Sequence, residues 1–138
     1  MSMSLVSPHE EVLFQSSSGT YVNSVTLSKD VSQFDAIRVQ AAKVDGTDWN
    51  VATCEGPVMT RNGKAGAHMA FVSSQLVGTE TIQIATASLL AEGTQLSIGS
   101  GFWLNTKAKT SNAGVAGAGK EDSFANYKVF CVIGIRYQ

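Results

Sequence analysis

A two-residue alternation of apolar and other side chains is the feature that most constrains how this chain folds. In residues 34–42, Ile37 and Val39 fall on one face of an extended chain, and Arg38 falls on the other. Alternation of this kind recurs from Val12 onward, whereas no segment carries the 3.6-residue period of a long amphipathic helix. We therefore predict an all-β protein.

Turn signals divide the alternating pattern into short segments. Asn62-Gly63 is the strongest signal, because these residue types adopt the positive φ angles that a type I′ hairpin turn requires. Residues 16–19, 45–48 and 99–101 are further predicted turns, and residues 107–122, rich in Gly, Ala and Lys, are a predicted loop. About eight or nine strands joined in this way are typical of an antiparallel β-sandwich, and we expect a jelly roll.

The chain is expected to form one domain preceded by a short arm. Its length of 138 residues fits a single core. We assign residues 12–138 to the β-sandwich and residues 1–11 to an N-terminal arm, which has no clear period and contains Pro8. The closing strand, residues 127–137, is apolar on both faces for part of its length, which indicates a central strand covered by the sandwich or by a neighbouring subunit.

Charged residues are scarce and balanced. They make up 15% of the chain, and ten Lys and Arg stand against eleven Asp and Glu. This balance argues against a nucleic-acid surface and against a polybasic membrane anchor, since both need clustered cations. We also find no membrane-spanning run and no secretory signal. Cys54 and Cys131 lie in apolar contexts, so we predict buried free thiols and synthesis in a reducing cytoplasm.

One segment resembles a phosphate-binding loop. Residues 114–120, GVAGAGK, match the first seven positions of that pattern. The pattern then requires Ser or Thr to ligate magnesium, and this chain has Glu121. A buried strand before the loop and a helix after it are also missing from the sequence pattern, so we interpret the segment as a flexible surface loop.

No other motif points to an enzyme or a metal site. The acidic turn at residues 45–50 lacks the ligand spacing of a calcium-binding loop. His9 and His68 have no further metal ligands at short spacing, although a spatial pair of Cys54 with His68 stays open. We therefore predict a non-enzymatic protein with no catalytic residues, no metal and no cofactor.

Aromatic residues beside turns are the candidate ligand contacts. Trp49 follows the turn at residues 45–48, and Trp103 follows the turn at residues 99–101. Exposed aromatic rings flanked by polar side chains stack on sugar faces while their neighbours bond the hydroxyl groups. The alternative is that both tryptophans belong to the core. The candidate contacts are Asp48, Trp49, Asn50, Trp103 and Asn105.

Two segments resemble a known family. Residues 20–39 read TYVNSVTLSKDVSQFDAIRV, and residues 127–137 read YKVFCVIGIRY. Both are similar to segments of the small β-sandwich knobs at the ends of tail fibres, tail tips and head fibres of tailed bacteriophages. This resemblance implies a homotrimer in the virion that binds a host-surface receptor or another virion protein.

We therefore expect a bacteriophage virion component, a trimeric knob that binds a host-surface glycan or protein. The alternative is a decoration or cementing protein of the capsid or tail. In both cases the arm, residues 1–11, is expected to attach the chain to other virion proteins. Low charge lowers the desolvation cost of an interface core, so sister subunits are expected to cover part of the surface.

Overall fold

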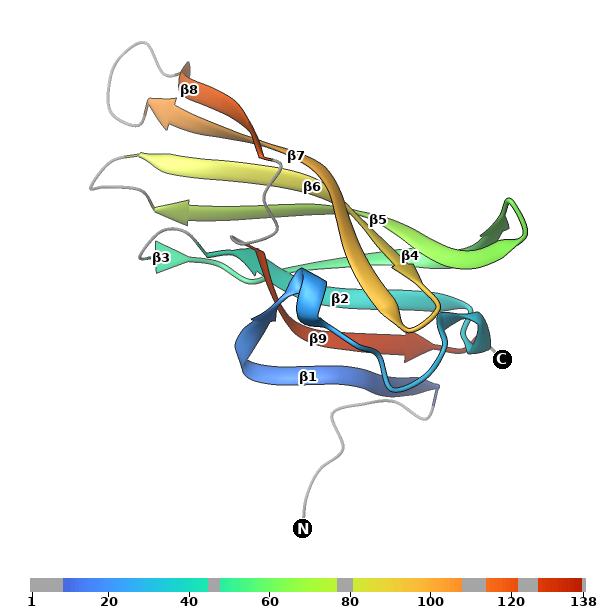
Figure 1. Ribbon diagram of the computed structural model, residues 1–138. Helices are drawn as coiled ribbons and strands as arrows, with labels where there is room; N and C mark the ends of the chain where they lie inside the picture. Colours follow the sequence, from blue (N-terminus) through green and yellow to red (C-terminus); the bar gives the residue numbers. More distant parts are fainter. Residues whose placement is uncertain (1–8, 45–47, 77–80, 108–113, 122–126, 138) are drawn as a thin grey trace.

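The computed structural model describes residues 9–44, 48–76, 81–107, 114–121 and 127–137, and these form an antiparallel β fold (Figure 1). The described residues contain nine strands and two single turns of 3-10 helix. The strands are β1 (Glu10–Tyr21), β2 (Ala36–Lys43), β3 (Asp48–Trp49), β4 (Ala52–Arg61), β5 (Lys64–Leu76), β6 (Ile82–Glu92), β7 (Gln95–Lys107), β8 (Gly114–Glu121) and β9 (Tyr127–Ile135). The 3-10 turns are η1 (Val22–Ser24) and η2 (Val31–Gln33). The predicted all-β antiparallel class is confirmed.

All nine strands belong to one sheet. Its order is β1-β9-β2-β4-β5-β6-β7-β8, and β3 pairs with β5 beside this path. Figure 1 shows the last strand, β9, lying between β1 and β2. Strands β4 to β8 follow one another as neighbours, in a meander, so the jelly-roll arrangement is not confirmed.

Strand β4 belongs to both halves of the sheet. Its residues 52–57 pair with β2, and its residues 58–61 pair with β5. Gly56 stands where the strand leaves one partner for the other: a Cβ atom built there would lie 2.5 Å from the main-chain oxygen of His68. A side chain at this position is therefore excluded by the close passage of β5.

The sheet curls until its two halves enclose one core. The bend of β7 in Figure 1 brings the β6–β7 hairpin beside the segment between η1 and η2, where Leu27 N donates to Thr94 O at 2.8 Å and Val31 N to Gly93 O at 2.9 Å. Aliphatic side chains of β2 and β9 share the buried cluster with those of β5 to β7. The ring of Phe71 on β5 packs edge-on against Tyr127 on β9, with 5.9 Å between centroids.

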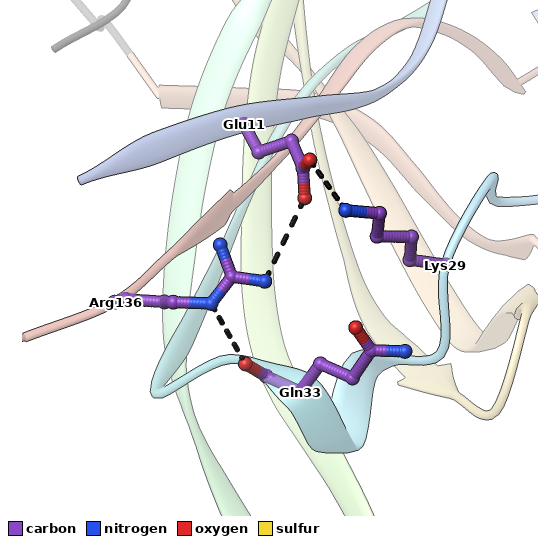
Figure 2. Close-up of polar contacts among 4 residues, drawn as sticks. All are labelled: Glu11, Lys29, Gln33 and Arg136. Carbon is purple, nitrogen blue, oxygen red and sulfur yellow. Dashed lines mark hydrogen bonds and ion pairs between the residues drawn. The ribbon is translucent and has the colours of Figure 1, made fainter. Parts of the chain in front are cut away.

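An ion-pair cluster fixes the start of β1 to the end of β9 (Figure 2). Lys29 Nζ lies 2.7 Å from Glu11 Oε1, and Arg136 Nη2 lies 3.8 Å from Glu11 Oε2. Arg136 Nε also donates to the main-chain oxygen of Gln33 in η2 at 3.2 Å. The fold takes in three residues that were expected in the arm: Glu10 and Glu11 lie in β1, and His9 O accepts a hydrogen bond from Arg136 N at 2.9 Å. Residues 1–8 lie outside the described residues.

Two predicted turns are irregularities within long strands. The pairing of β1 with β9 shifts register between Gln15 and Thr20, and the pairing of β7 with β6 shifts opposite residues 87–89. The extra residues of β1 and β7 at these two places form bulges, which bend a strand without ending it. The predicted loop at residues 107–122 contains strand β8, which pairs with β7 through its backbone. Asn62-Gly63 does form the predicted hairpin turn, with φ of 52° and 76°.

Gly56→Ala is expected to destabilise the fold by about 1–3 kcal/mol, because the new methyl group displaces the β5 backbone. Gly117→Ala is the matched control, since a Cβ there meets only the Trp103 ring at an ordinary 3.8 Å. Urea denaturation of both variants measures the difference. Equal stability of the two variants would contradict this account of the β4 crossing.

Candidate functional site

The first three residues of strand β6 place apolar side chains outside and a polar one inside. Ile82 and Ile84 are 46% and 38% exposed, whereas Gln83 between them is only 8% exposed. Alternation along β6 is as predicted, with the isoleucines on one face and Gln83 on the other. The usual preference for burying apolar side chains is therefore reversed at residues 82–84. The contacts on the two faces of the strand account for this reversal.

A buried amide cluster holds Gln83 in place. Its Oε1 accepts hydrogen bonds from Gln75 Nε2 at 2.6 Å and from Lys43 Nζ at 3.2 Å. Its Nε2 donates to Asn105 Oδ1 at 3.1 Å. Four strands contribute to the cluster: Lys43 from β2, Gln75 from β5, Gln83 from β6 and Asn105 from β7. These bonds offset the cost of burying polar groups.

On the opposite side, three neighbouring strands present an uncharged surface to solvent. We name it the β5–β7 outer face. Val72 and Phe102 are its most exposed apolar side chains, at 58% and 56%. None of its members is charged, and most are aliphatic or small. The members are Ala70, Val72, Ser74 and Leu76 of β5, Ile82, Ile84, Thr86 and Ser88 of β6, and Phe102 and Leu104 of β7.

Two shallow depressions hollow the region of this face. One, of about 360 Å³, lies where β4 and β5 diverge, and Val51, Val72 and Ile84 line it together with polar neighbours. The other, of about 290 Å³, is lined by Ala70, Thr86, Ala87, Ser88 and Phe102. Small side chains thus alternate with projecting ones, so the face has both protrusions and recesses.

The outer face of the other half of the sheet is different in character. There Arg38 on β2 bridges Glu10 on β1 and Glu55 on β4, with both N–O distances at 3.1 Å. These charges are already paired within the chain. The exposed side around Arg38 therefore carries paired charges, whereas the members of the β5–β7 outer face carry none.

The structure separates the predicted ligand contacts. Asn50 is exposed beside β5, where its Nδ2 donates to the main-chain oxygen and to Oγ of Ser74. Trp103 and Asn105 lie on the inner side of β7, opposite Ala85 and Gln83. Asp48 and Trp49 form β3 beside β5, and the structure does not describe their side chains.

Trp103 packs against the glycine-rich strand β8. A Cβ atom at Gly119 would lie 2.7 Å from the Trp103 indole ring, so the ring occupies the space that glycine leaves. Asn105 is engaged in the buried amide cluster. Both side chains have a packing role inside the sheet, and their role as ligand contacts stays a prediction.

The cysteines lie on either side of β2 and on opposite faces of the sheet. Cys54 pairs with Val39 and Cys131 with Gln40, and successive residues of a strand point to opposite faces. Cys54 is buried in the core, Cys131 is half-buried, and both are free thiols. The open pairing of Cys54 with His68 has no geometric support, because His68 is exposed.

No metal or membrane site emerges from the part of the chain that the structure describes. Within it, no three His, Cys, Asp or Glu side chains gather as a potential metal site. No helix in the described ranges has the length and apolar character needed to cross a membrane. The phosphate-loop-like segment at residues 114–120 lies in strand β8.

No family model, curated protein or solved structure matches this chain. The resemblance to phage knobs therefore stays a prediction. The β5–β7 outer face was not among the predicted site residues. Its signal in the sequence is the pair Ile82 and Ile84 around Gln83, together with the absence of charge from Met69 to Leu76.

Cys54 is expected to resist alkylation in the folded protein, because burial raises its pKa to about 11. At pH 8 the reactive thiolate is then about 100-fold rarer than for a thiol with the ordinary pKa of 9.0, and its fraction rises as the pH approaches 11. Mass spectrometry after iodoacetamide treatment measures this. Cys131, which is half-buried, is the internal control and should react first. Equal native rates at both sites would contradict the buried position of Cys54.

Proposed function

We propose that this protein is a non-enzymatic component of a bacteriophage virion, a homotrimeric knob that binds a host-surface glycan or protein. The observation that carries the binding role is the β5–β7 outer face, an exposed apolar surface without charge. Exposed apolar patches of this kind are typical of interaction surfaces in soluble proteins. The virion and trimer assignments are supported by the sequence resemblance at residues 20–39 and 127–137.

A receptor-binding role is tested on whole cells. Labelled protein is expected to bind cells of the phage host saturably, and purified surface polysaccharide of that host should compete if the receptor is a glycan. Heat-unfolded protein serves as the control. Absence of saturable binding to host cells would contradict the receptor assignment.

A decoration or cementing role is the second candidate, supported by the same apolar face, which also fits a protein partner. It predicts binding to phage particles that lack this chain and no binding to host cells. The two assays together separate the candidates. A chain that is absent from purified particles by mass spectrometry would contradict both.

Deletion of residues 1–8 is expected to release the chain from particles, because we assign attachment to the arm that precedes β1. Glu10 and Glu11 are retained in this variant, since they pair with Arg38, Lys29 and Arg136 in the folded domain. Circular dichroism is the control for folding, and immunoblotting of purified particles is the measurement. A full complement of the truncated chain on particles would show that attachment lies elsewhere.

A further inference from the structure

We propose that Asn62-Gly63, at the tip of the β4–β5 hairpin, is a site of spontaneous modification at which the folded protein exchanges a side-chain amide for a carboxylate. Asn62 is the only asparagine of the chain that precedes glycine. Figure 1 shows the tip of this hairpin projecting at the right of the molecule. The modification requires neither a virion role nor a partner, so it stands or falls apart from the proposed function.

Asparagine followed by glycine is the pair in which the main chain most readily attacks the side chain, because glycine has no Cβ atom to hinder the approach. The main-chain nitrogen of Gly63 bonds to Cγ of Asn62, loses its proton and expels the side-chain nitrogen as ammonia. Water, the only co-reactant, then opens the five-membered imide that results. Opening at Cγ gives aspartate. Opening at the main-chain carbonyl carbon gives isoaspartate, in which the main chain runs through Cβ and Cγ.

The tip of the hairpin is open to water and uncrowded. Asn62 and Gly63 are both exposed, and a Cβ atom built on Gly63 would meet nothing within 4 Å. Asn50 is exposed as well, but its amide donates two hydrogen bonds to Ser74, and it precedes Val51, whose branched side chain hinders the attack. The structure therefore distinguishes a reactive asparagine from a protected one.

The turn must open before the reaction occurs. With φ of 52° and 76°, Asn62 and Gly63 have the conformation of a type I′ turn, in which the Gly63 nitrogen points away from the Asn62 side chain. Rotation about the Cα–C bond of Asn62 brings the two groups together. Residues 59–64 are all exposed, so opening the tip uncovers no buried side chain and leaves the core intact.

Charge at the tip favours the product. Arg61 is exposed, and its side chain has no ion pair or hydrogen bond within the described residues. Lys64 stands on the other side of the turn, where its Nζ lies 3.8 Å from Glu92 Oε1. A carboxylate at position 62 thus forms between two cations of the chain, one of which lacks a partner in the part that the structure describes.

The two products affect the hairpin differently. Isoaspartate inserts Cβ into the main chain between Arg61 and Lys64, which pair with each other, so a turn of two residues no longer joins β4 and β5 in register. Aspartate keeps the turn, since Asp-Gly also adopts the type I′ conformation. Conversion therefore divides the protein into one form with an intact hairpin and one with a frayed tip.

The test is incubation of the folded chain at mildly alkaline pH, followed by peptide mapping with chymotrypsin. Cleavage after Trp49 and Phe71 places Asn50 and Asn62 in one peptide, so Asn50 is the internal control. We expect loss of the Asn62 amide, seen as the mass gain of hydrolysis, and retention of the Asn50 amide. Asn62→Gly is the matched variant, because Gly-Gly keeps the type I′ turn and has no amide to lose.

Two results of this mapping overturn the proposal. One is retention of the Asn62 amide in the folded chain over the time in which the urea-unfolded chain loses it. The other is equal loss at Asn50 and Asn62 in the folded chain.

Asn62→Asp separates the new charge from the altered main chain, because it carries the charge on an ordinary main chain. Hydrogen exchange of residues 58–67 is expected to rise in the isoaspartate fraction, isolated by chromatography, and to stay unchanged in Asn62→Asp. Circular dichroism establishes that both are folded. Equal exchange in the two would contradict the frayed tip.

Discussion

The register of β6, on which the exposed surface depends, is held by the buried 2.6 Å hydrogen bond between Gln75 and Gln83 and by the buried apolar side chains of β6 that point the same way as Gln83. Because side chains of a strand alternate with a period of two, fixing Gln83 inward fixes Ile82 and Ile84 outward. Asn105 extends the same constraint to β7, and Lys43 connects it to the other half of the sheet. The polar cluster and the buried apolar residues of β6 thus agree on which side chains meet solvent.

The curl of the sheet depends on a second constraint, the missing side chain at Gly56. β4 exchanges β2 for β5 as its partner near this residue, and the main chain of β5 passes where a Cβ would stand. Because β4 serves both halves, the inner faces close over one core while the outer faces diverge. One outer face carries the paired charges around Arg38, and the β5–β7 outer face has no charged member.

Alternation predicted the all-β class, and Asn62-Gly63 predicted its hairpin, because both are local properties of the chain. Residues 16–19 and 99–101 look like turns, yet long-range pairing with β9 and β6 carries the strands through them as irregularities. Strand β8 lacks apolar alternation in its sequence and is held by backbone hydrogen bonds to β7. The sequence pattern therefore did not predict it. Of the candidate site, alternation predicted that Ile82 and Ile84 share a face. Tertiary contacts, which are the amide cluster of Gln83 and the burial of Ala87 and Leu89, decide that this face is the outer one.

The position of β9 between β1 and β2 has a kinetic consequence. Glu10 of β1 and Ala36 of β2 both pair with Ile135 of β9, so neither β1 nor β2 completes its pairing before β9 is present. During synthesis the meander from β4 to β8 is available for pairing while β1 and one edge of β2 remain open until residues 127–135 emerge. Pairing in this half of the sheet is therefore completed only after β9 has been synthesised. Until β9 is available, the nascent chain presents unpaired strand edges, to which chaperones or neighbouring nascent chains have access.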